Sequence, residues 1–113
     1  MLIADDRSRS RMALKALLST HPGIDVVGEA ENGEEALRLV EERRPDAVLM
    51  DARMPAMDGL TATRLIKDRW PDVRVIVLTM YGARKSDAKA AGADAFLVKG
   101  CLTDKLLGAI REP

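Results

Sequence analysis

The sequence has little of what secreted, zinc-bound or membrane-spanning proteins need. Its 113 residues include one cysteine and one histidine, which excludes an internal disulfide and a zinc site built from these two residue types. No apolar run approaches the roughly 20 residues of a transmembrane helix. The first residues also lack the basic region and apolar stretch of a secretory signal. These absences predict a cytoplasmic protein that does not bind membranes.

Charge of either sign is not in excess. The chain has 18 Lys and Arg residues against 18 Asp and Glu residues, so net charge gives no reason to expect general attraction to nucleic acid or anionic lipid. A content of 47% hydrophobic residues is ordinary for a globular chain. The length predicts one domain, residues 1–113, around a single core.

What the sequence does contain is a series of short apolar runs that alternate with helical patterns. The runs are rich in Val, Ile and Leu and lack in-and-out alternation, which predicts strands covered on both faces. They span residues 2–4, 26–30, 47–50, 73–78 and 95–98. Asn32 and Glu35 have the spacing of a capping box for the second helix. Strict alternation predicts an α/β fold with a parallel sheet between two helical layers.

The fourth helical segment differs from the others because its apolar residues are all alanines. An alanine-only face buries little apolar area. We therefore expect residues 80–91 to be the least protected part of the domain.

Polar side chains stand at the ends of four expected strands. Asp5 and Asp6 follow the first strand, Asp51 the third, Thr79 the fourth and Lys99 the fifth. In open α/β sheets, ligands bind outside the carboxyl ends of the strands, near the point where strand order reverses. These side chains are therefore expected to converge on one pocket.

Such a pocket suits a phosphoryl group and a cation. Three carboxylates repel one another unless a cation joins them, and Mg²⁺ is favoured because it takes oxygen ligands, few of them from protein. The cations neutralise phosphoryl charge, the hydroxyl donates a hydrogen bond, and one carboxylate can be the nucleophile.

Each residue also has an ordinary structural interpretation. A strand-end Asp such as Asp5 or Asp6 often only caps the next helix, Thr79 can be a turn residue, and Lys99 can be a solvated charge. Asp51 is harder to explain in this way because it ends a buried apolar strand. The joint placement at four strand ends favours a functional site.

These residues lie in motifs that resemble the receiver domain of two-component response regulators over essentially the whole chain. The motifs are Ala4-Asp5-Asp6, Leu49-Met50-Asp51-Ala52-Arg53-Met54-Pro55-Ala56-Met57-Asp58-Gly59, Leu78-Thr79 and Ala91-Gly92-Ala93-Asp94-Ala95-Phe96-Leu97-Val98-Lys99. Each motif is weak to moderate alone, but all four in order are a strong match. The resemblance implies a flavodoxin-like doubly wound domain, with a five-stranded parallel sheet in the order 2-1-3-4-5 and five helices.

The resemblance also implies which residues take the phosphoryl group and the metal. Asp51 is the expected phosphoacceptor, supplied by the phosphohistidine of a sensor histidine kinase. Asp6, Asp51 and the backbone carbonyl of Arg53 are the expected direct ligands of Mg²⁺, and Asp5 is expected to act mainly through water.

Three further residues are implied in catalysis and switching. Lys99 is expected to pair with the phosphoryl oxygens, and Thr79 to donate a hydrogen bond to them. Phe96 is expected to turn inward as Thr79 moves. The added charge would then shift an equilibrium toward the active arrangement.

The details look most like receivers that precede a helix-turn-helix domain of the NarL/LuxR type. The motifs are Asp58-Gly59-Leu60-Thr61-Ala62-Thr63-Arg64, Thr79-Met80-Tyr81 and Lys99-Gly100. The sequence stops just after the expected fifth helix, so we expect an excised receiver in preference to a stand-alone one. The implied partners are the kinase, a second copy in a homodimer on phosphorylation, and DNA only through the absent domain.

Other function classes fit less well. A phosphatase working through an aspartyl-phosphate would need a second Asp at Asp-x-Asp spacing, which Asp51-Ala52-Arg53 lacks. We therefore expect no enzyme beyond a phosphoacceptor that assists its own phosphorylation and dephosphorylation. A pseudo-receiver that acts without phosphorylation remains the alternative. The basic cluster Arg7, Arg9 and Arg11 is expected to be a solvated helix face, or else a docking surface for the kinase.

Overall fold

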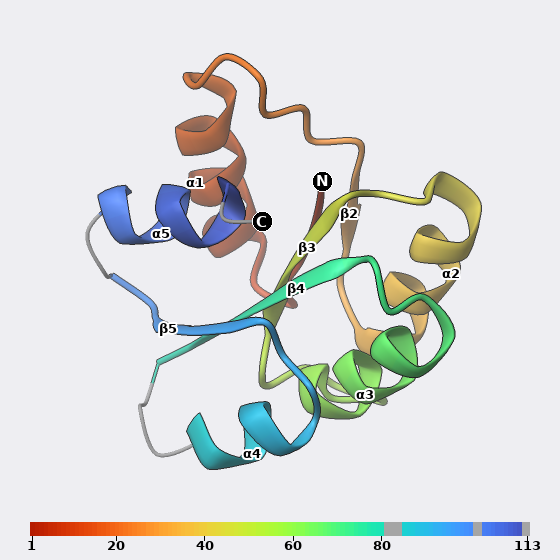
Figure 1. The fold of residues 1–113 in the computed structure, drawn as a ribbon. Coiled ribbons are helices and arrows are strands. Elements are labelled where there is room, and N and C mark those ends of the chain that lie inside the picture. The colour runs from red at the N-terminus through yellow and green to blue at the C-terminus, as the bar shows by residue number, and fades with distance from the viewer. Residues whose placement is uncertain (81–84, 101–102, 112–113) are drawn as a thin grey trace.

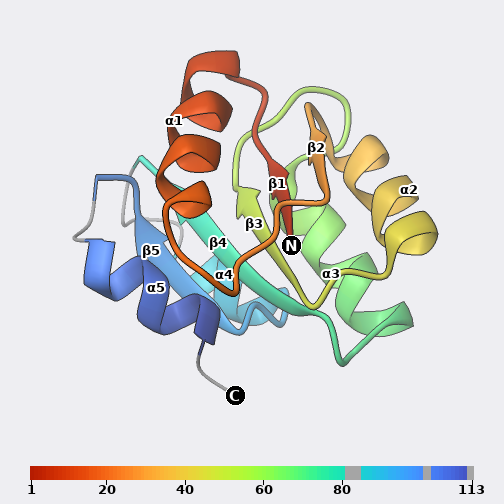
Figure 2. The ribbon, with the colours of Figure 1, turned by 90° about the horizontal axis from the view of Figure 1, so that it is seen from above.

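Five parallel strands form one sheet within residues 1–80, 85–100 and 103–111, the residues that this computed structural model describes. In chain order they are β1 (Leu2–Ala4), β2 (Gly28–Ala30), β3 (Ala47–Asp51), β4 (Arg74–Thr79) and β5 (Ala95–Val98). They pair in the order β2-β1-β3-β4-β5 (Figure 1; β1 is labelled in Figure 2). The predicted doubly wound order is confirmed, and β1 and β3 are neighbours where the order reverses.

Helices cover both faces of this sheet. One face carries α1 (Ser8–Ser19) and α5 (Thr103–Arg111), and the other carries α2 (Gly33–Arg43), α3 (Gly59–Arg69) and α4 (Lys85–Ala90) (Figure 1 and Figure 2). A helix lies between each strand and the next along the chain, as parallel pairing requires. Within the described residues, every helix is too short or too polar to cross a membrane.

The strands are buried on both sides because successive side chains enter different cores. Leu2, Val48 and Val75 pack with the α2, α3 and α4 layer, whereas Ile3 and Leu49 pack with α1 and α5. All five are at most 1% exposed. Burial of a side chain of this size contributes about 1.5–3 kcal/mol. The two cores explain why the strands read as continuous apolar runs.

Polar side chains cap the amino-terminal ends of α2 and α3. The Asn32 side chain accepts a hydrogen bond from the Glu35 amide at 2.8 Å, as the capping-box spacing predicts. Asp58 accepts one from the Thr61 amide at 2.8 Å. Each cap gives a partner to an amide that the helix itself leaves unsatisfied. The Asp58 cap therefore fixes the start of α3 at the end of the loop that follows β3.

Trp70 ends α3 at the edge of the sheet where the strands begin. The guanidinium groups of Arg44 and Arg69 lie 5.4 and 5.0 Å from its ring centre. Arg44 itself ends α2 in the left-handed conformation, with φ of 46°. Cation–π contacts of this kind are worth about 0.5–1 kcal/mol at exposed sites. They hold the carboxyl ends of α2 and α3 together.

The fourth helix is short, as the alanine-only pattern suggests. α4 has six residues, of which Ala88 is buried; Ala91, just after it, is 3% exposed. Residues 81–84, which belong to the segment expected to be least protected, lie outside the described residues, as do Cys101 and Leu102 next to α5. The low protection of this segment stays a prediction.

The loop between β3 and α3 contains a backbone conformation that does not suit its residue. Ala56 has φ of 65° and is exposed. The left-handed region costs an L-residue about 1–2 kcal/mol, whereas glycine adopts it freely but loses more entropy on folding. Ala56→Gly is therefore expected to stabilise the domain by about 0.5–1 kcal/mol, measured by urea unfolding.

The same substitution in a helix serves as the matched control. Ala16 is an exposed residue of α1, where glycine costs about 1 kcal/mol relative to alanine. Ala16→Gly should lower the urea midpoint while Ala56→Gly raises it. A fall in both variants would show that the loop is not strained at Ala56.

Candidate functional site

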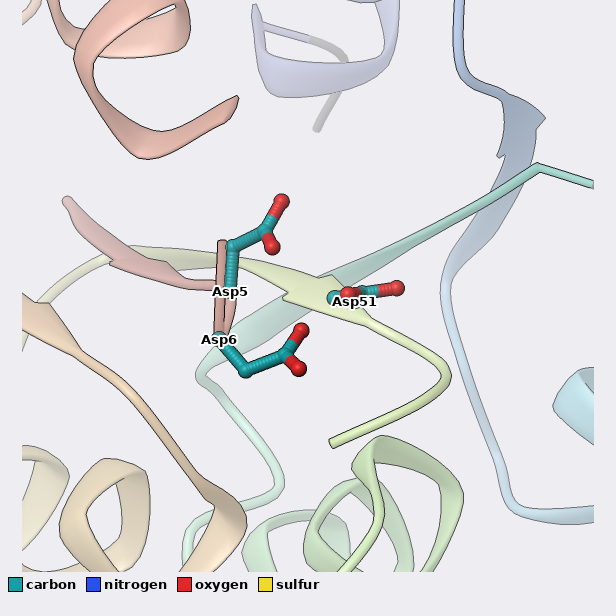
Figure 3. A group of neighbouring side chains, drawn as sticks. All are labelled: Asp5, Asp6 and Asp51. Carbon is teal, nitrogen blue, oxygen red and sulfur yellow. The ribbon is translucent and has the colours of Figure 1, made fainter. Parts of the chain in front are cut away.

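Three carboxylates from two neighbouring strands meet at the carboxyl-terminal edge of the sheet. Asp5 and Asp6 follow β1 and Asp51 ends β3, and each offers one oxygen within 4.8 Å of the others. Figure 3 shows the three side chains extending into the same region. Asp5 is 1% and Asp51 is 7% exposed, whereas Asp6 is exposed. The predicted convergence of these residues is what the structure shows.

Backbone hydrogen bonds hold the acidic residues on rigid strand ends. The Asp5 amide donates to the Ala30 carbonyl at 2.9 Å, although β1 ends at Ala4. The Ala52 amide likewise donates to the Leu78 carbonyl at 3.0 Å. The ladders thus continue past the strands, and the carboxylates gain a fixed mutual geometry of the kind that functional sites require.

Asp5 is a buried carboxylate with close donors. It accepts from Lys99 Nζ at 2.8 Å and from the Arg7 amide at 2.9 Å. Burial alone would raise the pKa of Asp5, but hydrogen bonds from Lys99, the Arg7 amide and the Ser10 hydroxyl outweigh burial and lower it. Asp5 is therefore ionised at neutral pH and already engaged with a cation. It does not cap α1, whose N-cap residue is Arg7.

Asp51 has weaker partners than Asp5. Lys99 Nζ lies 3.5 Å from its Oδ2, and the Arg53 amide donates to Oδ1 at 3.3 Å. Burial raises the pKa of Asp51 to about 6; Lys99 counteracts this, and the negative charge of Asp5 adds to it. Asp51 is thus ionised at neutral pH, but at a cost to the folded protein that a cation would relieve.

This raised pKa predicts a pH-dependent stability difference between the wild type and Asp51→Asn. The pKa of Asp51 lies near its ordinary value of 3.8 in the unfolded chain and at about 6 in the folded protein, so the folded protein binds the proton more tightly. Ionisation therefore destabilises the fold progressively between these values, by up to about 3 kcal/mol before solvent screening. Without divalent cations, Asp51→Asn should be more stable above about pH 6 and lose this advantage toward about pH 4.

Urea unfolding of both proteins in EDTA across this range would measure the effect. Added Mg²⁺ should reduce the difference by stabilising the wild type. A difference that is constant with pH would show that Asp51 titrates normally in the folded protein.

A cleft of about 410 Å³ opens over the acidic cluster. Its lining residues are Asp6, Arg7, Asp51, Arg53, Met54, Pro55, Thr79, Met80 and Lys99. Asp5 is absent from this lining, and its 1% exposure shows that it is shielded from the cleft. A hollow of about 520 Å³ at the opposite edge of the sheet is larger, but the convergent acidic cluster lies here. The cleft is large enough for a phosphoryl group and a hydrated cation.

The other predicted site residues lie where the strand ends place them. Lys99 has a side chain that is 12% exposed, and its backbone amide donates to the Thr79 carbonyl. Thr79 is 3% exposed and lines the cleft. Phe96, expected to turn inward, is already partly buried against the core on the α2, α3 and α4 side. Arg53 lines the cleft beside Asp51.

A glycine brings α3 into direct contact with the end of β3. A Cβ atom on Gly59 would lie 1.8 Å from the backbone oxygen of Asp51 and 2.8 Å from its carbonyl carbon. The Gly59 amide donates to the Ala52 carbonyl at 3.1 Å. Only a residue without a side chain allows the helix to start this close to Asp51.

Arg11 supports the site in a way that the sequence interpretation did not foresee. Arg7 and Arg9 are exposed as expected, but the Arg11 side chain is only 13% exposed. It donates to the Asp5 carbonyl at 2.8 Å and pairs with Glu29 at 3.4 Å. The solvated-face interpretation is therefore wrong for Arg11. Its side chain connects α1 to the backbone of Asp5 and to Glu29 in β2.

Comparisons with known proteins agree with this geometry. The sequence matches the family described as the response regulator receiver domain over residues 1–111. It is 42% identical over 109 residues to the uncharacterized transcriptional regulatory protein YhcZ of Bacillus subtilis, covering 95% of this chain and 51% of that protein. It is 41% identical over 114 residues to the chemotaxis protein CheY of the same organism, covering 99% and 94%.

A solved structure supports the same assignment. A two-component response regulator of the LuxR family from Aurantimonas sp. superposes with a TM-score of 0.90 at 34% identity, covering 96% of this chain and 79% of that one. The chain spans about half the length of the curated transcriptional regulators that it matches.

Proposed function

Since this chain belongs to the response regulator receiver domain family of two-component systems, we propose that it is a phosphorylation-dependent switch in which Asp51 accepts a phosphoryl group from a sensor histidine kinase. In this reaction an Asp51 carboxylate oxygen bonds to phosphorus as the bond from phosphorus to the histidine nitrogen breaks. The imidazole leaves with the electron pair and takes up a proton. The product is an aspartyl phosphate at the end of β3.

The observation that carries this proposal is the difference between the three carboxylates. Asp5 is buried, accepts a hydrogen bond from Lys99 at 2.8 Å and is absent from the cleft lining. Asp6 lines the cleft but is exposed. Asp51 lines the cleft and is nearly buried, with its nearest cation at 3.5 Å. It therefore combines access and ionisation at neutral pH with oxygens that have only distant partners, at 3.3 Å and 3.5 Å, and so remain available for attack.

The residues present fit a magnesium ion. Two oxygens bound to one Mg²⁺ at about 2.1 Å can be at most about 4.2 Å apart. The three carboxylates offer oxygens that all lie within 4.8 Å of one another, so at most a small closure is needed. Asp6, Asp51 and the Arg53 carbonyl would hold the ion, with Asp5 acting through water because its oxygens already accept hydrogen bonds. When bound, the ion would neutralise charge on the carboxylates and on the phosphoryl oxygens.

Lys99 and Thr79 would stabilise the phosphorylated state. Lys99 provides an ammonium group beside Asp51, and Thr79 provides a hydroxyl in the same cleft. Contacts that form only with the phosphoryl group favour the arrangement that makes them, so phosphorylation would shift an existing equilibrium. Phe96, two residues before Val98, the partner of Thr79 in the β4–β5 ladder, would respond to the movement of Thr79.

The output would lie outside this chain. The transcriptional regulator YhcZ is about twice as long as the matched region, which supports control of transcription through a helix-turn-helix domain, assisted by homodimer formation on phosphorylation. CheY, matched over 94% of its length, supports a stand-alone receiver as the alternative. In either case the proposed reaction with the kinase would take place in the cytoplasm. The chain would assist its own phosphorylation and dephosphorylation without being an enzyme for another substrate.

Mass spectrometry after incubation with acetyl phosphate tests the proposed function. With Mg²⁺ the protein should gain the mass of one phosphoryl group, and EDTA should prevent the gain. A protein that folds but never gains this mass would be a pseudo-receiver that acts without phosphorylation.

The metal site makes a separate prediction. Removing even an outer partner of a metal ligand costs about 10–100-fold in affinity, so loss of the Asp6 carboxylate should weaken Mg²⁺ binding by more than about 10-fold. NMR titration of Asp6→Ala would measure this through the amides around Asp51. Asp68→Ala, at an exposed position of α3, should bind like the wild type. Equal affinity in Asp6→Ala would place the metal elsewhere.

A further inference from the structure

Ser10 contacts the site lysine from outside the cleft. Its Oγ accepts a hydrogen bond from Lys99 Nζ at 3.3 Å, across 89 residues of chain. Ser10 lies in α1 and does not line the cleft; it lines a separate hollow of about 250 Å³ between α1 and α5. Lys99 lines both hollows. Its ammonium group therefore stands between the cleft on one side and Ser10 on the other.

The Lys99 ammonium lies at unequal distances from its three acceptors, Asp5, Ser10 and Asp51. It donates to Asp5 at 2.8 Å and to Ser10 at 3.3 Å, and lies 3.5 Å from Asp51. An ammonium has three N–H donors, and nitrogen-to-oxygen hydrogen bonds are usually about 2.7–3.2 Å long. Only the hydrogen bond to Asp5 lies within this range; the one to Ser10 is slightly longer, and Asp51 is the acceptor held least closely.

We propose that Ser10 is a positioning residue that holds the Lys99 ammonium toward α1 in the unphosphorylated protein and so competes with the group on Asp51. This inference rests on the proposed function of Asp51. When the phosphoryl group arrives, its oxygens need a donor from Lys99, and the contact with Ser10 is the weaker of the two that hold it back. The hydroxyl of Ser10 therefore stabilises the resting state more than the phosphorylated state.

Removing the hydroxyl should make the active state easier to reach. In Ser10→Ala the resting state loses the hydrogen bond from Lys99, which the phosphorylated state does not need. The hydrogen bond from the Ser10 hydroxyl to Asp5 is lost from both states alike. A hydrogen bond of this kind corresponds to roughly a 2- to 10-fold change in an equilibrium constant. Alanine is a better helix former than serine, so α1 should remain intact in this variant.

Beryllium fluoride with Mg²⁺, a phosphoryl mimic, provides the probe. It would be titrated into the 113-residue chain and followed by NMR at the amides around Asp51. Ser10→Ala should be half-saturated at a concentration about 2- to 10-fold lower than the wild type. Ser10→Thr, which keeps a hydroxyl, should resemble the wild type. Ser8→Ala, the same change at an exposed position of α1, should also resemble it.

A second signal separates positioning of Lys99 from a general effect on α1. The ¹⁵N resonance of the Lys99 ammonium should shift between the wild type and Ser10→Ala in the free proteins, and the two should coincide when the probe is bound. Unchanged or weaker binding by Ser10→Ala would overturn the inference while leaving the proposed function standing. A wild type that neither binds the probe nor takes a phosphoryl group would overturn both.

Discussion

Asp51→Asn is expected to gain no phosphoryl mass when incubated with acetyl phosphate and Mg²⁺, under conditions in which the wild type gains one group. The change replaces the attacking carboxylate oxygen with a neutral amide, which is a poor nucleophile, and keeps the size of the side chain. The fold should be retained, because burial makes the charged form of Asp51 unfavourable and Asn has no charge to bury. Loss of the gain would therefore reflect chemistry, not unfolding.

The neighbouring acids make the control important. Asp5 and Asp6 lie close enough to accept a phosphoryl group in principle, since the three residues offer oxygens within 4.8 Å. Asp68→Asn, an exposed site on α3, should keep the full gain. A gain of equal size in Asp51→Asn would assign the acceptor to another residue, and fragmentation of the labelled protein would locate it.

Gly59→Ala is expected to destabilise the domain by about 3–5 kcal/mol, at the upper end of what single substitutions do. The added Cβ would lie 1.8 Å from the backbone oxygen of Asp51. This oxygen belongs to β3, which pairs with β4 through Leu78, so neither side of the contact can move cheaply. A domain with about 5–15 kcal/mol of total stability would keep only part of it. The urea midpoint measures the change.

Gly108 provides the matched control for this substitution. It lies in α5, and a Cβ there would meet no atom within 4 Å. Alanine in a helix is favoured over glycine by about 1 kcal/mol, so Gly108→Ala should raise the urea midpoint. If Gly59→Ala is as stable as the wild type, then the contact between α3 and Asp51 is looser than the structure shows. A folded Gly59→Ala protein should also be phosphorylated more slowly, because Asp51 would be displaced.

The strand ends and their polar residues could be predicted because they depend on local chemistry. A strand buried on both faces must be apolar, so the first polar residue, such as Asp5 or Asp51, marks where the strand leaves the core. The first and last residues of a strand were less predictable where they depend on pairing with a neighbouring strand. β2 begins at Gly28, two residues later than the apolar run suggests, because β1 offers only three residues for pairing.

The contacts that support the site could not be predicted in the same way. Whether Arg11 faces solvent or Asp5 depends on how α1 is rotated against the sheet, and no spacing within α1 encodes this. The contact between Ser10 and Lys99 joins residues 89 positions apart. The closeness of Gly59 to Asp51 depends on the entry angle of α3. Each is a property of packing between elements, which one sequence does not reveal.

The position of Trp70 makes its fluorescence a convenient probe of unfolding. It is the sole tryptophan of the sequence, and its two arginine neighbours hold it at the edge of the sheet where β4 begins. The acidic cluster lies at the other edge, so ligands there should leave the indole environment almost unchanged. Its emission should respond when the carboxyl ends of α2 and α3 separate. Intrinsic fluorescence therefore follows unfolding with little interference from the chemistry at Asp51.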